Sequence, residues 1–446
     1  MQLTANVRPR NTFRTLLLVV AALLAALSWG STVRASPSDD EDHPATARDD
    51  GKDDSKDEAA KTAKKAATKS LEDTATERAG TEIAGYLDSD HVAVFTPSVH
   101  AGIENVSGAS INASYLVDVV SAASADIVST ASNRWQEVRQ AGSLGAQYKP
   151  HDFGVGLGGS VSSEPDYLSV GFFSTIVKDF DEKNYTLTAG YGYSHDTAGR
   201  CGDNGQCTPF SVFSRPLQRG SFNVGLAWVV DRASLASVTA DMVFESGDQS
   251  KVYRYIPMFS PGIAPQIPNG ASAALVNNYR LPERPLEQLP LARRRFALTG
   301  RYAHRFETST VRLEERFYDD DWGLLASSTD ARWIFDLGKR FALWPHARLH
   351  VQKSVSFWER AYVSANPGAN GDGWNLPLYR TGDRELGPLW TTEGGGGIKW
   401  YLGSDTDPRS WQLGFTADAM YTAYTNDIYL TSRTGYLGAC TLEAEW

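Results

Sequence analysis

Two histidines in the segment FALWPHARLHV, residues 341–351, are the first candidates for chemistry. His346 and His350 would share one face of a strand, because side chains alternate between the two faces of a strand. Four residues along a strand separate them by roughly 13 Å, which is too far for a single metal ion. We therefore interpret both as polar groups of a lumen or an interface, and the sequence predicts no metal site.

The familiar catalytic motifs do not occur in this sequence. It contains no G-x-S-x-G elbow and no HExxH motif. The GGGG run at 394–397 lacks the GKS or GKT ending of a phosphate-binding loop, so it is expected to mark a bend or the close approach of a plug or loop. The sequence predicts no catalytic residue and no cofactor, and we do not expect an enzyme. Only a convergent Ser–His or Asp–His pair at the outer rim would favour a barrel enzyme.

The three cysteines divide into a close pair and a single residue. Cys201 and Cys207 lie in the polar, glycine-rich segment CGDNGQC. In an oxidising compartment they are expected to form a disulfide, and their spacing matches no zinc-binding pattern. Cys440 is expected to remain unpaired, against lipid or protein.

Charged residues alternate with apolar neighbours in many segments. In VRLEERF, 311–317, the side chains of Val311, Leu313 and Phe317 would face one way, while Glu315 breaks this apolar face. A charge that faces lipid costs about 2–4 kcal/mol near the midplane of the bilayer, so the alternating charges should point into a lumen. The lumen-lining candidates are Arg139, Asp241, Glu245, Arg301, Arg305, Arg312, Glu314, Arg316, Arg332, Asp336, Arg348 and Asp418.

Two interpretations of this charged face remain open. The face could line a water-filled pore or solute path. It could instead be a self-neutralising network that fills a narrow barrel, which the mixed sign of the charges slightly favours.

The elements that must position these residues are strands of about ten residues. In YTLTAGYGYS, 185–194, the apolar and aromatic residues share one face, and SFNVGLAWVV, 221–230, and WQLGFTADAMYTA, 411–423, repeat the pattern. The candidate strands are 91–103, 108–118, 136–148, 152–162, 167–178, 184–194, 221–230, 233–245, 294–305, 308–317, 322–335, 340–352, 391–403, 410–424 and 436–446.

This list is odd in number, whereas single-chain bacterial barrels have even numbers of strands. One strand is therefore missing or wrongly assigned. The first candidate, 91–103, is the main suspect and could enter the lumen as a plug. The sequence predicts an all-β fold, an antiparallel transmembrane β-barrel of about 14 strands, range 12–16.

Short and long connections alternate, as periplasmic turns and external loops do in such barrels. Residues 195–220, 246–292 and 356–390 form the long connections. The second is rich in proline but also carries aromatic residues, so we expect it to pack into or over the lumen. We expect it to contact the part of the wall that bears Arg301, Arg305, Arg312 and Arg316.

The N-terminal segment has the features of an export signal. Arg8, Arg10 and Arg14 form a basic start, and an apolar run follows from Leu16 to Leu27. Cleavage is expected after Ala35, which gives a signal peptide at 1–35. The alternative is an uncleaved anchor, but the apolar run is short for a membrane-spanning helix.

A densely charged segment follows the signal. Residues 36–88 carry too little apolar surface to fold by themselves, so they predict a disordered charged periplasmic tether. The predicted barrel then covers 89–446. The formal net charge of −10 argues against nucleic acid as a partner.

The last candidate strand ends in an aromatic residue. Read back by twos from Trp446, the residues are mostly apolar, which resembles the C-terminal signal that the barrel insertion machinery recognises. Aromatic side chains favour the membrane interface. The expected partners are therefore outer-membrane lipid and the barrel insertion machinery, and the expected location is the outer membrane.

The stretch 308–363 resembles an uncharacterised family of Gram-negative outer-membrane proteins, defined by a domain of unknown function. Its most recognisable part is FYDDDWG, 317–323, and the paired VSAAS and VSTAS at 120–132 and RRFALTGRYAHRF at 294–306 resemble the family too. The resemblance covers about 90–446. It implies an outer-membrane β-barrel but no substrate and no catalytic residue.

These observations favour a channel or transport barrel for small solutes, because a charged inner face occurs together with long external loops. The alternative is a plugged structural or surface-interaction barrel without transport.

Overall fold

The computed structural model describes residues 75–122, 135–202, 206–364, 375–404, 407 and 410–446. The predicted signal peptide, 1–35, and the part of the tether before residue 75 lie outside these residues. Within the described part, no helix is both long and apolar enough to cross a bilayer.

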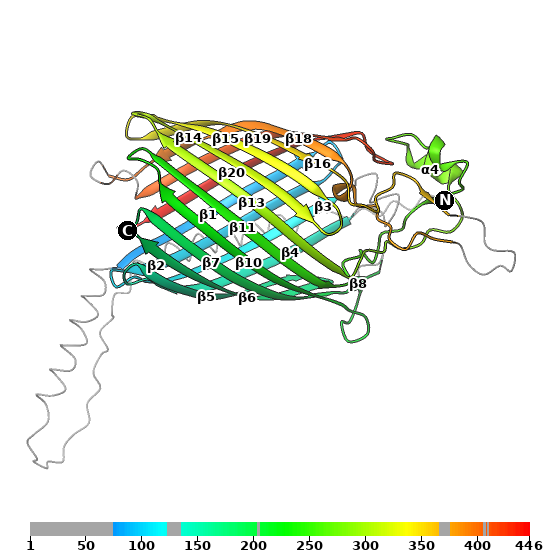
Figure 1. Ribbon diagram of the computed structural model, residues 1–446, viewed down its shortest axis with the longest axis horizontal. Coiled ribbons are helices and arrows are strands. Elements are labelled where there is room, and N and C mark those ends of the chain that lie inside the picture. The colour runs from blue at the N-terminus through cyan, green and yellow to red at the C-terminus, as the bar shows by residue number, and fades with distance from the viewer. Residues whose placement is uncertain (1–74, 123–134, 203–205, 365–374, 405–406, 408–409) are drawn as a thin grey trace, which may run out of the picture. The chain divides into compact units, whose positions relative to one another are not determined.

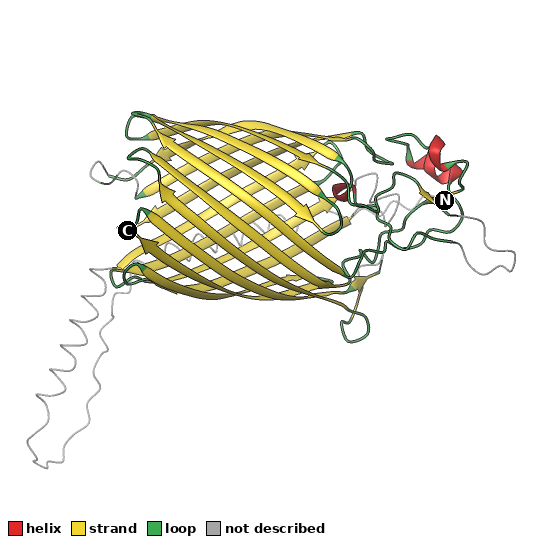
Figure 2. Cartoon of the chain, viewed as in Figure 1, coloured by secondary structure: helices red, strands yellow, loops and turns green. Residues whose placement is uncertain are grey.

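Sixteen antiparallel strands form one closed barrel (Figures 1 and 2). The strands in chain order are β1 (Ala75–Asp88), β2 (Ala93–Asn105), β3 (Ala109–Ala122), β4 (Trp135–Tyr148), β5 (Phe153–Glu164), β6 (Tyr167–Phe180), β7 (Tyr185–Ala198), β10 (Arg215–Val229), β11 (Ser234–Gly247), β13 (Ala292–Arg305), β14 (Ser309–Asp320), β15 (Leu325–Leu337), β16 (Phe341–Gln352), β18 (Leu389–Tyr401), β19 (Trp411–Tyr424) and β20 (Ser432–Glu445). Each strand pairs with its neighbour in this order, and β1 pairs with β20, from Arg78 opposite Glu445 to Asp88 opposite Gly435. Closure of the wall leaves no free strand edge.

The predicted closed antiparallel barrel is confirmed, and its sixteen strands are the upper limit of the predicted range 12–16 and two more than the central estimate of about 14. All fifteen predicted strands correspond to wall strands, and β1 is the missing one. It lies inside the range assigned to the tether, 36–88, so the wall begins at Ala75. The suspicion that 91–103 forms a plug was wrong, because β2 pairs with β1 and β3 in the wall.

One face of the wall carries exposed apolar side chains. Tyr191 of β7 lies opposite Phe222 of β10, Phe222 opposite Met242 of β11, and Met242 opposite Phe296 of β13. These four side chains are 37–47% exposed. Such a belt of apolar residues, repeated around a closed barrel, is the lipid-facing surface of a membrane protein.

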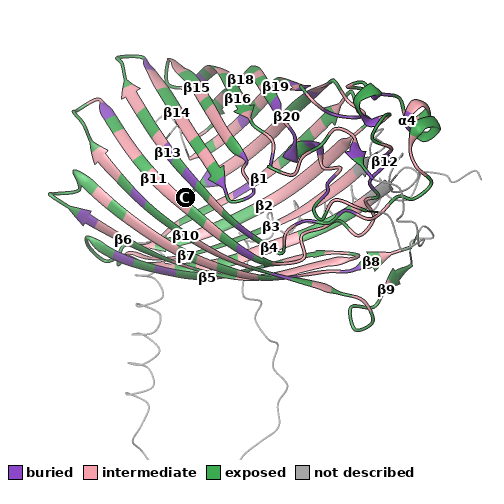
Figure 3. Ribbon diagram, turned by 45° about the vertical axis from the view of Figure 1, so that its right-hand side comes forward, coloured by how far each residue is buried: buried purple, intermediate pink, exposed green. Residues whose placement is uncertain are grey.

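The buried apolar core lies mainly outside the wall, in the connections at one end. It gathers residues of 248–291, of the described parts of 353–388 and of 425–431, which together we call the external cap (Figure 1). The wall strands themselves are mainly exposed or intermediate in Figure 3. The short elements outside the wall are β8 (Arg200–Cys201), β9 (Cys207–Thr208), β12 (Met258–Phe259), η1 (Ala264–Gln266), α4 (Ala273–Tyr279), β17 (Tyr362–Val363) and η2 (Arg384–Leu386).

The cap is built from two long connections that pair with each other. Strand β12, in 248–291, lies parallel to β17, in 353–388, and Met258 packs beside the buried Tyr362. A second apolar cluster joins Phe259 and Val276 to Ile428 of the shorter connection 425–431. The proline-rich segment 246–292 is therefore ordered by burial of its apolar residues, as its composition predicts.

Candidate functional site

The register places all twelve predicted lumen residues on the face of the wall opposite the apolar belt. On β14, for example, Phe317 is exposed on the apolar face and Arg316 lies on the other. The ion pair between Arg316 and Asp241 spans the intervening strand β13, with Nη1 and Oδ2 3.1 Å apart. Side chains converge in this way on the concave side of a closed wall, so this face is the inner one.

Several of these charges neutralise one another along the inner wall. Arg301 Nε lies 2.6 Å from Glu314 Oε2, and Arg305 Nη2 lies 2.5 Å from Asp336 Oδ2. Arg316 donates a second hydrogen bond to Thr299. Part of the inner wall is therefore a network of opposite charges that neutralise one another, as one of the two interpretations predicted.

The same side chains are nevertheless well exposed. The side chains of Arg139, Arg301, Arg305 and Arg332 retain 45–51% of their accessible surface. The arginine of a packed pair, Arg293 beside Asp320, retains only 9%. The space beside the inner-wall arginines is thus wide enough for water.

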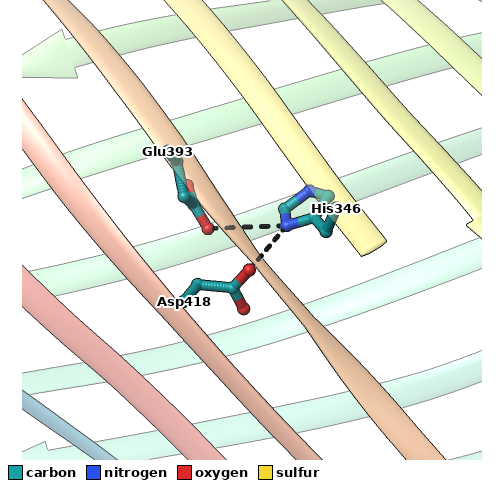
Figure 4. Close-up of side chains that lie close together, drawn as sticks. All are labelled: His346, Glu393 and Asp418. Atoms are coloured by element: carbon teal, nitrogen blue, oxygen red, sulfur yellow. Dashed lines mark hydrogen bonds and ion pairs between the residues drawn. The ribbon is translucent and has the colours of Figure 1, made fainter. Parts of the chain in front are cut away.

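A histidine and three carboxylates form a compact group on the inner wall, and Figure 4 shows His346 with two of them, Glu393 and Asp418. His346 of β16 has Nδ1 2.8 Å from Asp418 Oδ1 and Nε2 2.8 Å from Asp330 Oδ2, and Glu393 Oε1 lies 3.9 Å from Nδ1. His346, Glu393 and Asp418 have the donor types and spacing that could hold a divalent metal. Both ring nitrogens already contact carboxylates, as in an imidazolium ion, so these contacts need no metal.

Glycine at position 395 makes this group possible. Gly395 of β18 lies opposite both His346 and Asp418 in the register. A Cβ atom there would stand 2.4 Å from Asp418 Oδ1 and 2.2 Å from the backbone oxygen of Ala417. The glycine run thus lets side chains of two wall strands, β16 and β19, meet across β18.

Glu245 lies in a denser group nearer the cap. It is buried between Arg219 and Arg295, with its carboxylate oxygens 3.5 Å and 2.7 Å from their guanidinium nitrogens. Arg219 also contacts the buried Asp196, at 2.7 Å. Glu245 was predicted from the sequence, but its partners Arg219 and Arg295 were not. They lie on other strands, and the strand register that makes them neighbours of Glu245 cannot be read from the sequence.

The model of a family described as a protein of unknown function, DUF3570, matches residues 131–443, which is more than half of the chain. The chain belongs to the DUF3570 family. This agrees with the predicted resemblance to an uncharacterised outer-membrane family. The matched residues include the wall strands from β4 to β19 and most of β20.

Several solved structures resemble this DUF3570 chain at low sequence identity. They include the siderophore receptor PirA from Acinetobacter baumannii (13% identity, TM-score 0.39, 78% of this chain and 53% of that one), the CymD monoaromatic hydrocarbon channel (8%, 0.38, 84% and 88%) and OccD1 (8%, 0.39, 83% and 95%). The chain thus spans about half the length of that receptor. At these scores the resemblances say nothing about substrate. No curated relative matches the chain by sequence.

The location follows from the architecture itself. An even-numbered, closed, antiparallel barrel with an apolar outer belt is the architecture of bacterial outer-membrane proteins. The DUF3570 chain has this architecture, and it is an outer-membrane β-barrel.

Among the described residues, the proline-rich loop 246–292 forms no hydrogen bond or ion pair with Arg301, Arg305, Arg312 or Arg316, the arginines that it was predicted to contact. The hydrogen bonds and ion pairs of Arg301, Arg305 and Arg316 in the described structure all go to wall residues. The charged residues of the loop instead serve the cap. Glu287 accepts hydrogen bonds from Thr381 Oγ1 at 2.6 Å and from Arg254 Nη1 at 3.1 Å.

Charge pairing holds the two long connections together. Arg254 Nη1, in 248–291, also lies 3.1 Å from Asp383 Oδ2, in 353–388. Burial raises the pKa of Asp383, but the charge and hydrogen bond of Arg254 outweigh this and hold the pKa below its usual value. The deprotonated form of Asp383 is therefore the one that links the connections.

The remaining predicted residues are the three cysteines and Trp446. A disulfide joins Cys201 and Cys207 in the connection between β7 and β10, and Cys440 is a free thiol on β20. Trp446 exchanges backbone hydrogen bonds with Glu77 and donates from Nε1 to the Glu77 carboxylate at 2.7 Å. Trp446 thus lies at the seam where the first and last strands close the wall.

Proposed function

We propose that this DUF3570 barrel is a passive outer-membrane channel for small polar or charged solutes. The observation that carries the proposal is the exposure of four inner-wall arginines, Arg139, Arg301, Arg305 and Arg332, whose side chains keep 45–51% of their accessible surface within a closed wall. Charged groups that stay hydrated offer a solute a route with a small desolvation cost.

The size of the wall supports the same proposal. Barrels of about 8 strands are filled by their own side chains, whereas those of about 16–18 strands leave an aqueous channel. The sixteen strands here place this chain in the second class.

The alternative is a plugged barrel whose external cap serves structure or surface interaction. The observation that favours it is the ordered cap, with three apolar clusters and buried charges such as Glu287 and Arg384. Under the channel proposal the same cap narrows the entrance and limits the size of the solute.

Liposome swelling tests the proposal. Purified, folded protein is reconstituted into liposomes, which are then diluted into isotonic solutions of neutral solutes of increasing size. A channel predicts fast swelling with the smallest solutes and a sharp decline with size. Swelling no faster than in protein-free liposomes for every solute would support the plugged barrel.

A further inference from the structure

Three arginines on adjacent strands concentrate positive charge at one place on the inner wall. Arg312 of β14 lies directly opposite Arg332 of β15, and Arg348 of β16 lies opposite Asp330, two residues from Arg332. We propose that Arg312, Arg332 and Arg348 form a binding site for small carboxylate or phosphate anions in the lumen. This inference rests on the proposed channel function and names its solute class.

The direct opposition of Arg312 and Arg332 is the first argument. Like charges at directly opposed positions of neighbouring strands repel and destabilise the pair. Arg332 has one carboxylate, Asp330, at 3.6 Å. Arg312 has no hydrogen bond or ion pair to any described residue, and its side chain is exposed. A bound anion would supply the missing negative charge.

The second argument is that His346 occupies the carboxylates that would otherwise neutralise Arg348. The register partners of Arg348 are Asp330 on β15 and Glu393 on β18. Asp330 lies 2.8 Å from one ring nitrogen of His346, and Glu393 lies 3.9 Å from the other. Arg348 is left exposed, without an ion pair among the described residues.

The opposite wall carries a strand of small residues on its inner face. In the strand order of the barrel, β3, β4 and β5 lie across from β14, β15 and β16. The inner face of β5 carries Gly154, Gly156, Gly158, Ser160 and Ser162, which have small side chains or none. Side chains of neighbouring segments, those of Lys149, Thr175 and Phe173, lie over the three glycines. These three side chains therefore bound the space across from the arginines.

The chemistry of guanidinium sets the ligand class. Each arginine presents a planar fork of N–H donors that matches the two oxygens of a carboxylate or phosphate, and it stays charged at every physiological pH. Neighbouring strands lie about 4.8 Å apart, so three forks on adjacent strands can converge on one small anion.

Ion selectivity is the first test. Reversal potentials are measured in a potassium chloride gradient for the wild type and for R312Q, R348Q and the double variant. The wild type should prefer chloride, and the double variant should lose this preference several-fold. The matched control is K178Q, which removes one positive charge from the outer face of β6 and should change nothing.

The outcomes separate the two proposals. If the wild type conducts but the variants keep its selectivity, the anion site is wrong and the channel stands. If neither the wild type nor the variants conduct, the channel is wrong, and the binding test below decides on the anion site alone. Each variant is first checked for heat-modifiable gel migration, which shows that its barrel is folded.

Thermal unfolding with inorganic phosphate is the second test and needs no conduction. Phosphate at low millimolar concentration should raise the unfolding temperature of the wild type and K178Q, since a ligand stabilises the state that it binds. R312Q should be more stable than the wild type without phosphate, because a repulsion is removed, and should gain little from phosphate. R312K, which keeps the charge but loses the fork, should retain selectivity with a weaker response to phosphate. Equal phosphate shifts in the wild type and R312Q would overturn the proposal.

Discussion

At the scale of single residues, the glycines of β18 show how one position can decide a contact between two other strands. The side chains of His346 and Asp418 meet at 2.8 Å across the inner side of Gly395. A side chain on Gly395 would collide with the Asp418 carboxylate and with a backbone oxygen that cannot move easily.

We therefore predict that Gly395→Ala lowers the stability of the barrel by about 1–3 kcal/mol, the range that overpacking usually costs. Gly394→Ala is the matched control, because a Cβ atom at Gly394 meets nothing within 4 Å. The measurement is the temperature at which the folded gel band disappears. Equal transition temperatures for the two variants would show that the contact is unimportant.

The disulfide between Cys201 and Cys207 is a local feature of the connection between β7 and β10. Replacement of both cysteines by serine should leave the barrel transition nearly unchanged, because the bond lies outside the hydrogen-bonded wall. Mass spectrometry of unreduced peptides from freshly isolated protein should find the bond in the wild type. Two free thiols there, or unfolding of the double variant, would contradict this.

At the scale of elements, alternation predicted the fifteen strands whose outer faces are rich in large apolar or aromatic residues. Strand β1 was missed because its outer face, Ala79, Thr81, Ile83, Gly85 and Leu87, carries no aromatic residue and directly follows the charged tether. Its pairing with β2 and β20 identifies it as a strand. Such pairing between segments far apart in the chain cannot be predicted from the local sequence.

The candidate site was also predictable only in part. Alternation placed Arg312, Arg332 and Arg348 on the polar face, but which charges pair depends on the register between strands. Asp330 and Glu393 were therefore missed, although Asp330 lies two residues from the predicted Arg332. An acidic residue on the polar face of a predicted strand was the available signal.

The external cap is the element that should control access. Deletion of 253–275 removes β12 and the residues that pack on Tyr362 and Ile428, so the two long connections should separate. We predict that this deletion raises single-channel conductance several-fold while the barrel keeps its heat-modifiable migration. A fall in thermal stability with unchanged conductance would assign the cap a structural role only.

The cap should also respond to acid. The folded-state pKa of Asp383 lies below its unfolded value of 3.8, so its contribution to stability is present above that value. The contribution disappears as pH falls through the folded-state pKa. We predict that pepsin cleaves the cap slowly at about pH 5 and rapidly at about pH 2, whereas Asp383→Asn is cleaved rapidly at both. Wild-type cleavage that is independent of pH would contradict the role of this carboxylate.

At the scale of the whole molecule, closure joins β1 to β20, and Trp446 lies at that seam against Glu77. We predict that Trp446→Ala slows assembly in the outer membrane, because it removes an interfacial aromatic and a hydrogen bond at the point of closure. The control is Trp358→Ala in the cap, which should leave assembly rates unchanged. Pulse-labelled cells assayed for the folded gel band give the measurement, and equal rates for both variants would make the terminal aromatic incidental.

The inner wall carries different kinds of side chain on its two sides. Arginines crowd β13 to β16, while small residues cover much of β5 on the other side. Positive charge is therefore concentrated on one side of the inner wall, which is the distribution that the proposed anion site needs.

Single-channel recording in planar bilayers tests the central claim most directly. Purified wild-type protein and the 253–275 deletion variant are added in turn to bilayers in potassium chloride. A water-filled lumen predicts discrete current steps for the wild type, which prefer the anion, and larger steps for the deletion variant. Folded protein that inserts but gives no steps in either form would contradict the account, since a closed lumen would then remain closed without its cap.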